Sequence, residues 1–423
     1  MDRPRHQEIK GLLRGLDMSR PLAIVMGGSV NGLSFARSLR RRGVPVLMLD
    51  SDRLIGTYTR HARFTLLPAA NEQPEVWLDF LDLLASNLSQ KAVLFPTSDV
   101  HTEFIALNAE RLRPTFSFLV CDAPVMDRII DKRLQYEGAL EAGVPIPGTH
   151  FPQSTHDVET TAAGLRYPCI LKPYKSHVGR KKIPKKVVLV DSPERLVTEF
   201  RRVSSPGVAF MVQEIIPGGD QALYGYLAFW DGESQERAWL TKQKLRQNPP
   251  LYGDGSLQQT VEVPEVATLS RQLLTYFNYR GFVGVEFKYD ARDSTYRLME
   301  INPRTVSGNQ LAISAGVDFP WLGYQYLTGD DPDAGRRVTF VPGVKYVNEE
   351  WDFSAYLALR KTGALTFRSW VHSLKGVSAR AIWSWSDPGP MGVVLWRITR
   401  GAARRAWHRL PFSHRSQSSA AAK

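Results

Sequence analysis

Residues 281–304, GFVGVEFKYDARDSTYRLMEINPR, decide the fold, because two strand-like runs joined by a polar turn predict a β-hairpin. Glu300 and Asn302 stand two residues apart and share one strand face, and the neighbouring strand can present Glu286 to the same point. These oxygen-bearing side chains suit a Mg²⁺ ion that bridges nucleotide phosphates, and the nearby Arg304 suits phosphate binding. Glu286 alone would fit the solvent face of a half-exposed hairpin, but the combination favours a functional site.

Within this hairpin, residues 299–304 (MEINPR), preceded by Glu286, resemble the metal-binding hairpin of ATP-grasp enzymes. The resemblance covers residues 131–330, with a looser match to the superfamily's N-terminal sheet domain over residues 21–125. It implies an ATP-dependent ligase that activates a carboxylate as an acyl phosphate and couples it to an amine. The implied cofactors are ATP and Mg²⁺, with Mn²⁺ as an alternative metal. By this resemblance the metal ligands are Glu286, Glu300 and Asn302, and Arg304 is a catalytic residue.

Three upstream segments stand in the order that the superfamily shows. They are residues 131–147, which resemble the start of the grasp domain, residues 167–173 (YPCILKP), which resemble the second lysine strand, and residues 212–218 (VQEIIPG), which resemble the hinge whose backbone holds adenine. The resemblance implies an ATP site formed by Lys132, Lys172, Gln213, Glu214, Ile215, Ile216, Asp220 and Lys242. Asp220 would either accept hydrogen bonds from the ribose hydroxyls or cap the turn after Gly218.

Lys172 and Lys132 differ in how the charge of each ammonium group can be stabilised. Lys172 ends an apolar strand, where a buried ammonium group is costly unless an anion meets it. Lys132 could equally be a surface lysine whose methylene groups pack on the protein while its ammonium group stays in water. Residues 174–183 (YKSHVGRKKI) form a polar loop with four cations where the superfamily has a mobile, more glycine-rich loop over the phosphates. The positive charge of this loop suits a lid that closes over a triphosphate.

Residues 241–250 (TKQKLRQNPP) place three cations at alternating positions. Lys242, Lys244 and Arg246 are therefore expected on one strand face, where like charges are costly unless an anion relieves them. The segment resembles the part of carboxylate–amine ligases that reaches the transferred phosphate or the substrate carboxylate. This resemblance adds Lys244 and Arg246 to the predicted catalytic residues.

The N-terminal part begins like a parallel sheet. Residues 22–26 (LAIVM) form an apolar run that ends in a glycine turn, a helical pattern follows, and a second apolar run at residues 44–49 ends in Asp50. This order predicts a β-α-β unit of a Rossmann-like sheet. The turn has glycines at positions 27, 28 and 32, which do not give the spacing G-x-G-x-x-G. We therefore favour a structural turn over an NAD site.

A later strand ends in polar residues. Residues 92–95 (AVLF) run into residues 96–99 (PTSD), which places small polar groups and a carboxylate at the carboxyl edge of the sheet, where such folds hold ligands. A helix N-cap formed by Ser98 or Asp99 explains the same residues without a ligand. Both interpretations stay open at this point.

Size and composition indicate a soluble globular protein of two to three domains. The chain has 423 residues, of which 43% are hydrophobic and 23% are charged. Its two cysteines, Cys121 and Cys169, lie far apart and imply neither a disulfide framework nor a zinc site. The N-terminus lacks a secretory apolar core, and no apolar run has the length of a membrane span. We expect a cytoplasmic protein.

The positive charge is concentrated near the C-terminus. From Pro342 onward there are 13 Lys or Arg and 4 Asp or Glu, a surplus of nine within the net charge of +12, together with six of the ten tryptophans. Residues 391–410 could form a basic helix that lies on an anionic membrane surface, on the inner face of the membrane. A cap packed on the ligase core is the favoured alternative, and binding of nucleic acid is not expected because no recognition module accompanies these residues.

The expected fold class is α/β and α+β. The predicted parts are an N-terminal tail (1–20), a Rossmann-like pre-ATP-grasp domain (21–125), a two-lobed ATP-grasp domain (126–332), a C-terminal extension rich in Trp and Arg (340–410) and a disordered tail (411–423). Within the superfamily the chain is similar to carboxylate–amine ligases, some associated with cell-surface polysaccharide biosynthesis, and to D-aspartate ligases. The expected partners are a small carboxylic acid and an amine, and a homodimer is left open. Two alternatives remain, namely a bicarbonate-activating carboxylase or carbamoylating enzyme, and a catalytically inert nucleotide-binding regulator.

Overall fold

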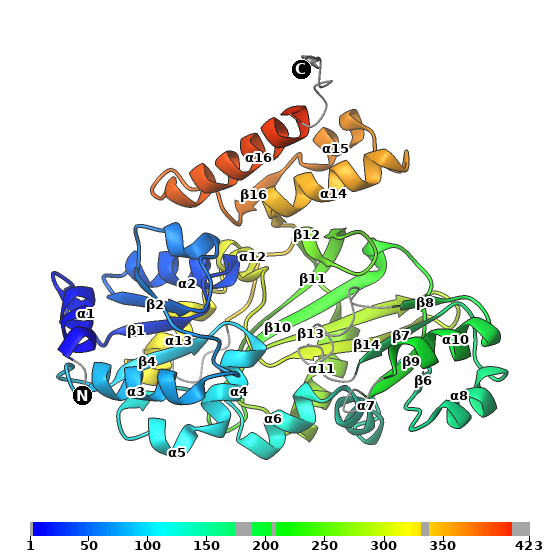
Figure 1. The fold of residues 1–423 in the computed structure, drawn as a ribbon, viewed down its shortest axis with the longest axis horizontal. Helices are drawn as coiled ribbons and strands as arrows, with labels where there is room; N and C mark the ends of the chain where they lie inside the picture. Colours follow the sequence, from blue (N-terminus) through cyan, green and yellow to red (C-terminus); the bar gives the residue numbers. More distant parts are fainter. Residues whose placement is uncertain (1–2, 174–187, 205–208, 331–337, 408–423) are drawn as a thin grey trace, which may run out of the picture.

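The computed structural model describes residues 3–173, 188–204, 209–330 and 338–407, with side chains described from residue 5 to residue 400. Three β-sheets organise this part of the chain, and Figure 1 shows the C-terminal helices lying across one side of the assembly. The predicted basic loop at residues 174–183 and the predicted tail at residues 411–423 fall outside the described residues.

The N-terminal lobe is a five-stranded parallel sheet in the order β3-β2-β1-β4-β5. Its strands are β1 (Ala23–Met26), β2 (Val46–Asp50), β3 (Arg63–Leu66), β4 (Ala92–Pro96) and β5 (Phe116–Ser117). Its helices are α2 (Val30–Arg40), η1 (Ile55–Tyr58), α3 (Pro74–Ala85), α4 (Asp99–Leu107) and α5 (Ala109–Leu112). The central strands are buried along their whole length, as the continuous apolar runs require. The Rossmann-like sheet is therefore confirmed.

The glycine turn after β1 brings the start of α2 close to the sheet. A Cβ atom on Gly32 would lie 1.9 Å from the carbonyl oxygen of Gly27, so only glycine permits this approach. Asp50, at the end of β2, accepts a hydrogen bond of 2.5 Å from the backbone N–H of Gly28. The carboxylate at the strand end thus braces the turn, and Ser29 caps α2.

A smaller lobe contains four antiparallel strands in the order β6-β9-β7-β8. They are β6 (Thr149–His150), β7 (Cys169–Pro173), β8 (Val188–Val190) and β9 (Phe210–Glu214). Helices α8 (Thr155–Ala162) and α10 (Pro193–Val203) bury Val158, Leu196 and Phe200 against this sheet. Helices α6 (Ala123–Ile130) and α7 (Lys132–Glu141) precede it and connect it to the N-terminal lobe.

The central sheet has seven strands in the order β14-β13-β10-β11-β12-β15-β16. They are β10 (Leu223–Trp230), β11 (Glu236–Asn248), β12 (Asp254–Thr260), β13 (Gly281–Asp290), β14 (Thr295–Asn302), β15 (Lys345–Val347) and β16 (Val377–Arg380). The accompanying helices are η2 (Asp220–Ala222), α11 (Pro264–Tyr276), α12 (Asn309–Ser314) and α13 (Phe319–Thr328). The predicted hairpin is confirmed as β13 and β14, which pair in antiparallel fashion with Glu286 opposite Glu300.

The C-terminal region is joined to the central sheet. Strands β15 and β16 pair in parallel and extend that sheet, and helices α14 (Glu349–Lys361), α15 (Phe367–Ser373) and α16 (Gly389–Trp407) surround this edge (Figure 1). Val394 of α16 is buried in one cluster with Val30, Ile55 and Tyr346. The first half of α16 therefore packs as a cap on the rest of the protein.

The first twenty residues include a helix where the sequence suggested only a tail. Helix α1 (Arg3–Leu13) places Ile9 at 0% exposure in the core of the N-terminal lobe. Leu12 and Leu13 pack against the same cluster. The reason is that these apolar residues fall on one face of α1, which the sheet domain covers.

A buried ion pair joins the C-terminal region to the N-terminal lobe. The guanidinium group of Arg37 on α2 donates to Asp387 at 2.9 Å and to the carbonyl oxygen of Ile382 at 2.7 Å. Asp387 also accepts hydrogen bonds from the hydroxyl group of Thr59 and the backbone N–H of Arg60. Both charged side chains are almost fully buried, at 4% and 1% exposure, so neither can turn to water if the other is removed.

We predict that Asp387→Ala lowers the free energy of unfolding by about 3–5 kcal/mol, because it leaves the buried Arg37 without its counter-charge. Arg397→Ala, which breaks the more exposed pair with Glu350, should cost at most about 1 kcal/mol. Urea unfolding followed by circular dichroism measures both values. Equal losses in the two variants would contradict the assignment of Asp387 as the link between the lobes.

Candidate active site

A cavity of about 430 Å³ lies where the three lobes meet. Its charged lining residues are Lys132, Lys172, Glu214, Lys242, Lys244, Asp254, Glu286, Lys288, Glu300 and Arg304. The N-terminal lobe contributes uncharged residues to the lining, namely Ser29, Val30, Asn31, Thr97 and Ser98. Every site residue predicted from the sequence lines this cavity except Arg246 and Asp220. The cavity therefore has a charged wall and an uncharged wall.

Two glutamates face each other on the charged wall. Glu286 of β13 and Glu300 of β14 are direct cross-strand partners, and Asn302 follows on the same face of β14. The ammonium group of Lys132 lies 2.9 Å from Glu300, and that of Lys244 lies 2.6 Å from Glu286. Each carboxylate is thus matched by a lysine from another element, α7 or β11.

Lys242 is the most deeply enclosed of these lysines. It is 6% exposed, and its ammonium group donates to the side-chain oxygen of Gln258 at 2.5 Å. A Cβ atom on Gly225 of the adjacent strand would come within 2.9 Å of the Lys242 side chain, so glycine leaves room for the lysine there. Burial of the ammonium group, reinforced by the charge of Lys244, lowers the pKa of Lys242 to about 8.

Arg246 does not share the face of Lys242 and Lys244, and this expectation from the sequence is wrong. A β-bulge between Lys244 and Arg246 adds one residue to β11 and reverses the alternation of side chains. The guanidinium group of Arg246 instead makes two hydrogen bonds of 2.7 Å to Asp352 on α14. Gln247 takes the place in the cavity lining that the sequence pattern gave to Arg246.

Asp220 is also outside the cavity lining. Its carboxylate accepts hydrogen bonds from the backbone N–H of Gln247 at 2.9 Å and from the side-chain amide of Gln247 at 2.8 Å. The Asp220 side chain therefore binds β11 and does not cap the turn after Gly218. Asp220 acts on the cavity through Gln247, which it holds in place.

The hinge segment forms the third side of the cavity. Glu214 ends β9, and its carboxylate accepts from the backbone N–H of Gly148 at 2.8 Å and pairs with Arg292 at 3.1 Å. Arg292 lies in the turn between β13 and β14 and also pairs with Asp290. This ion pairing lowers the pKa of Asp290 far below its usual range. The ion pair between Arg292 and Glu214 therefore joins the hinge to the glutamate hairpin.

Lys172 and Gln213 lie side by side in the smaller lobe. The ammonium group of Lys172 donates to the side-chain oxygen of Gln213 at 2.9 Å, and the Gln213 amide donates to the hydroxyl group of Thr149 at 2.9 Å. Ile215 and Ile216 continue the lining, with Ile216 at 1% exposure. An apolar surface next to a strand-like backbone is a surface that suits a planar heterocycle such as adenine.

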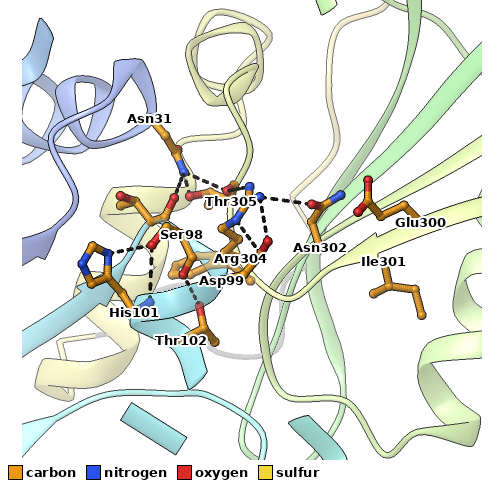
Figure 2. A network of polar contacts seen from close by, with 12 residues as sticks. Asn31, Ser98, Asp99, His101, Thr102, Glu300, Ile301, Asn302, Arg304 and Thr305 are labelled. Atoms are coloured by element: carbon orange, nitrogen blue, oxygen red, sulfur yellow. Dashed lines mark hydrogen bonds and ion pairs between the residues drawn. The ribbon is translucent and has the colours of Figure 1, made fainter. Parts of the chain in front are cut away.

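Arg304 connects the charged wall to the uncharged one. Its guanidinium group donates to Asp99 of α4 at 2.8 Å and to the side-chain oxygen of Asn302 at 3.2 Å (Figure 2). Burial opposes the charge of Arg304, but Asp99 outweighs it, so the pKa of Arg304 stays above its usual value. Asn31 of α2 donates to the backbone carbonyls of Thr97 and Thr305, at 3.1 and 2.7 Å. The N-terminal lobe is thereby held against the hairpin.

Sequence reasoning missed several lining residues. Lys288 stands two residues after Glu286 on β13, and that spacing could have placed it on the same face. Burial lowers its pKa. Asp254 and Trp351 offered no local signal, because they reach the cavity only through the pairing of β12 and the packing of α14. Gln258 of β12 contacts the cavity lining through its hydrogen bond with Lys242.

The surroundings of the cavity match a known family. The family model described as "ATP-grasp in the biosynthetic pathway with Ter operon" matches residues 242–350. D-aspartate ligase of Enterococcus faecium (strain Aus0004) is 25% identical over 315 residues, which cover 69% of this chain and 73% of that protein.

Solved structures agree on the fold. The L-amino acid ligase of Bacillus licheniformis superposes with a TM-score of 0.58 at 15% identity, covering 77% of this chain and 78% of that one. N5-carboxyaminoimidazole synthetase of Staphylococcus aureus, complexed with ADP, superposes with a TM-score of 0.58 at 15% identity, covering 77% and 80%.

Fold and site together are those of an ATP-grasp protein, and residues 242–350 match an ATP-grasp family model. The chain is a nucleotide-binding, ATP-dependent carboxylate–amine ligase. Among curated proteins, it is similar to D-aspartate ligase.

Side-chain oxygen atoms on the charged wall are of the kind that suits a Mg²⁺ ion. Glu286, Glu300 and Asn302 present hard oxygen atoms on adjoining positions of one hairpin. The described residues hold no group of three or more His, Cys, Asp or Glu side chains suited to a metal. A cation bound here would therefore need further oxygen ligands, which nucleotide phosphates supply.

Replacement of Lys242 is expected to change how stability depends on pH. The pKa of Lys242 is about 8 in the folded chain against an ordinary value of 10.5, so the unfolded chain binds more protons between pH 8 and 10.5. Wild-type stability should therefore rise relative to Lys242→Met across this window, by up to about 1.4 kcal/mol per pH unit.

Urea unfolding of the wild type and Lys242→Met between pH 7 and pH 10 measures this difference. Lys361→Met, at an exposed lysine of α14, is the matched control and should follow the wild type at every pH. A constant difference between the wild type and Lys242→Met would show that burial does not perturb the lysine.

Proposed function

We propose that this ligase activates a small amino acid carboxylate as an acyl phosphate and then transfers the acyl group to an amine. The observation that carries the proposal is the meeting, in one cavity, of paired glutamates, lysines from different lobes and an arginine anchored by Asp99. The printed names of the relatives, a D-aspartate ligase and an L-amino acid ligase, support an amino acid as the acid substrate.

The nucleotide would lie between the smaller lobe and the central sheet. Its adenine would contact the backbone at residues 213–216 and the apolar side chain of Ile216. Lys132, Lys172 and Lys242 line the path from this hinge toward the paired glutamates and would neutralise the phosphates. Because Lys242 is buried, its charge is weakly screened and acts strongly on a bound anion.

Glu286, Glu300 and Asn302 would hold Mg²⁺, which neutralises phosphate charge when it is bound. Arg304 and Lys244 lie next to these ligands and would stabilise the charge that develops on the transferred phosphoryl group. Arg304 is fixed in advance by Asp99, so little reorganisation accompanies the reaction. Arg246, which binds Asp352, has no part in this proposed mechanism.

The acid-activating step can be trapped with hydroxylamine, which converts an acyl phosphate into a hydroxamate that is measured as its coloured iron(III) complex. We expect hydroxamate and ADP to form from Mg-ATP with at least one member of a panel of L- and D-amino acids. Glu300→Gln and Glu286→Gln should lower the rate on the order of 100-fold, because each removes a charge from the metal and phosphate site.

Glu262→Gln, at an exposed glutamate between β12 and α11, is the matched control and should keep wild-type activity. Formation of ADP that depends on bicarbonate alone, without hydroxamate from any amino acid, would favour the carboxylase alternative instead. Tight ATP binding with no ADP formation under any condition would favour the inert regulator.

The C-terminal surface supports a second role, which is contact with an anionic membrane. The exposed residues of this region include Trp385, Leu395 and Trp396, at 87%, 56% and 57% exposure, and the cations Arg380 and Arg400, of which Arg400 lies over the Trp396 ring. Exposed tryptophans beside arginines suit the interface of a bilayer with anionic headgroups. No helix in the described part of the chain is long and apolar enough to cross a bilayer, so contact would be peripheral.

Vesicle sedimentation tests this role. The protein should bind vesicles of phosphatidylcholine with 30% phosphatidylserine, and the double variant Trp385→Ala/Trp396→Ala should bind about tenfold more weakly. Addition of 0.5 M salt should release the wild type, because the lipid attraction is electrostatic in part. Binding that the double variant retains in full would exclude this surface as the contact.

A further inference from the structure

Four carboxylates line the cavity, and three of them have a cation as partner. The three pairs are Glu300 with Lys132, Glu286 with Lys244, and Glu214 with Arg292. The fourth carboxylate belongs to Asp254, at the start of β12. This side chain is exposed and makes no hydrogen bond or ion pair with the residues that the structure describes. Its carboxylate oxygens are therefore available to a molecule in the cavity.

The turn between β11 and β12 determines where Asp254 lies. Asp254 pairs with Asn248 across the two strands. A Cβ atom on Gly253 would lie 2.1 Å from the backbone of Asn248, so only glycine lets the chain turn this closely. The ammonium group of Lys244 lies 3.5 Å from the carbonyl oxygen of Gly253. Asp254 is thus the next residue after a contact of Lys244, which the proposed mechanism places at the transferred phosphoryl group.

Asp254 is not a further ligand of the proposed metal site. A third carboxylate close to Glu286 and Glu300 would make a group of three acidic side chains suited to a metal, and the described residues contain no such group. The order of the central sheet explains the separation, because β10 and β11 lie between the glutamate hairpin and β12. The free carboxylate of Asp254 therefore suits a ligand other than the metal.

An ammonium group is the ligand that this position suits best. An ionised carboxylate only accepts hydrogen bonds, so its partner in the cavity must donate them. This requirement excludes phosphate and carboxylate groups. A hydroxyl group would bind less well than a cation, because charge-assisted hydrogen bonds are about twice as strong as neutral ones. An amino acid carries an ammonium group close to the carboxylate that the proposed reaction activates.

The two substrates differ in the charge that their nitrogen atoms need. The attacking amine has to lose its proton before it can react, and a neighbouring carboxylate would hold that proton. The ammonium group of the amino acid takes no part in the reaction and can stay charged throughout. Resting on the proposed ligase function, we propose that Asp254 binds the ammonium group of the amino acid whose carboxylate is activated. Asp254 thereby selects an amino acid over a plain carboxylic acid.

Steady-state assays of hydroxamate formation measure this selection, with hydroxylamine as the acceptor. Asp254→Asn keeps the shape of the side chain and removes its charge. It should raise the KM for the amino acid about tenfold, while the KM values for ATP and hydroxylamine stay within about twofold of the wild type. Asp254→Glu, which restores the charge, should recover part of the loss.

A competitor without the ammonium group separates recognition from general damage to the cavity. The competitor is the same acid with hydrogen in place of the amino group, such as propionate for alanine or succinate for aspartate. In Asp254→Asn its inhibition constant should not rise, because it lacks the group that Asp254 binds. A variant that only distorted the cavity would weaken both ligands alike. Glu262→Gln, at the exposed glutamate two residues after β12, removes the same charge and should leave every constant unchanged.

An unchanged KM for the amino acid in Asp254→Asn would overturn the inference, and so would an equal rise in the inhibition constant of the competitor. A raised KM for hydroxylamine alone would overturn it in favour of a role for Asp254 in binding the amine. If the wild type forms no hydroxamate with any amino acid, the proposed function itself fails. An active wild type with an indifferent Asp254→Asn variant removes only the assignment of Asp254.

Discussion

Two glutamates stand directly opposite each other on neighbouring strands, and the arrangement of the lobes depends on that pairing. Like charges at paired positions of a hairpin repel, so Glu286 and Glu300 need cations close by. Lys132 reaches Glu300 from α7 and Lys244 reaches Glu286 from β11. The lysines come from separate parts of the chain. The negative charge of the hairpin is therefore balanced by ion pairs with α7 and β11, and these pairs hold the elements of the cavity together.

The bulge in β11 lets one strand serve two purposes. Before the bulge, Lys242 and Lys244 face the cavity, and after it Arg246 faces α14 and is neutralised by the buried Asp352. A regular strand would have placed three cations on the same side. Because the bulge removes the third, the site avoids added repulsion, and the C-terminal region gains a buried ion pair with the central sheet. Gln247, held by Asp220, fills the position that results.

The sequence alone was enough to predict the elements that have strong local patterns. It was not enough to predict side-chain positions that depend on contacts between distant segments. The apolar runs of β1, β2 and β4 and the spacing of Glu286, Glu300 and Asn302 were enough to predict the sheet and the hairpin. Arg246 was misplaced because a bulge leaves no mark in a simple alternation of charges. The partners of Arg304 and Lys242, which are Asp99 and Gln258, follow from tertiary packing, and no spacing along the chain indicates them.

The division of the cavity into two walls bears on how an amine can react there. Only an uncharged amine has a lone pair free to attack an acyl group, yet most amines are protonated at neutral pH. The charged wall carries six cations and four carboxylates, and the residues of the N-terminal lobe that line the cavity carry no charge. A surplus of positive charge lowers the pKa of a nearby amine and so favours its uncharged form. The residues of the N-terminal lobe in the lining add no carboxylate that would offset this surplus.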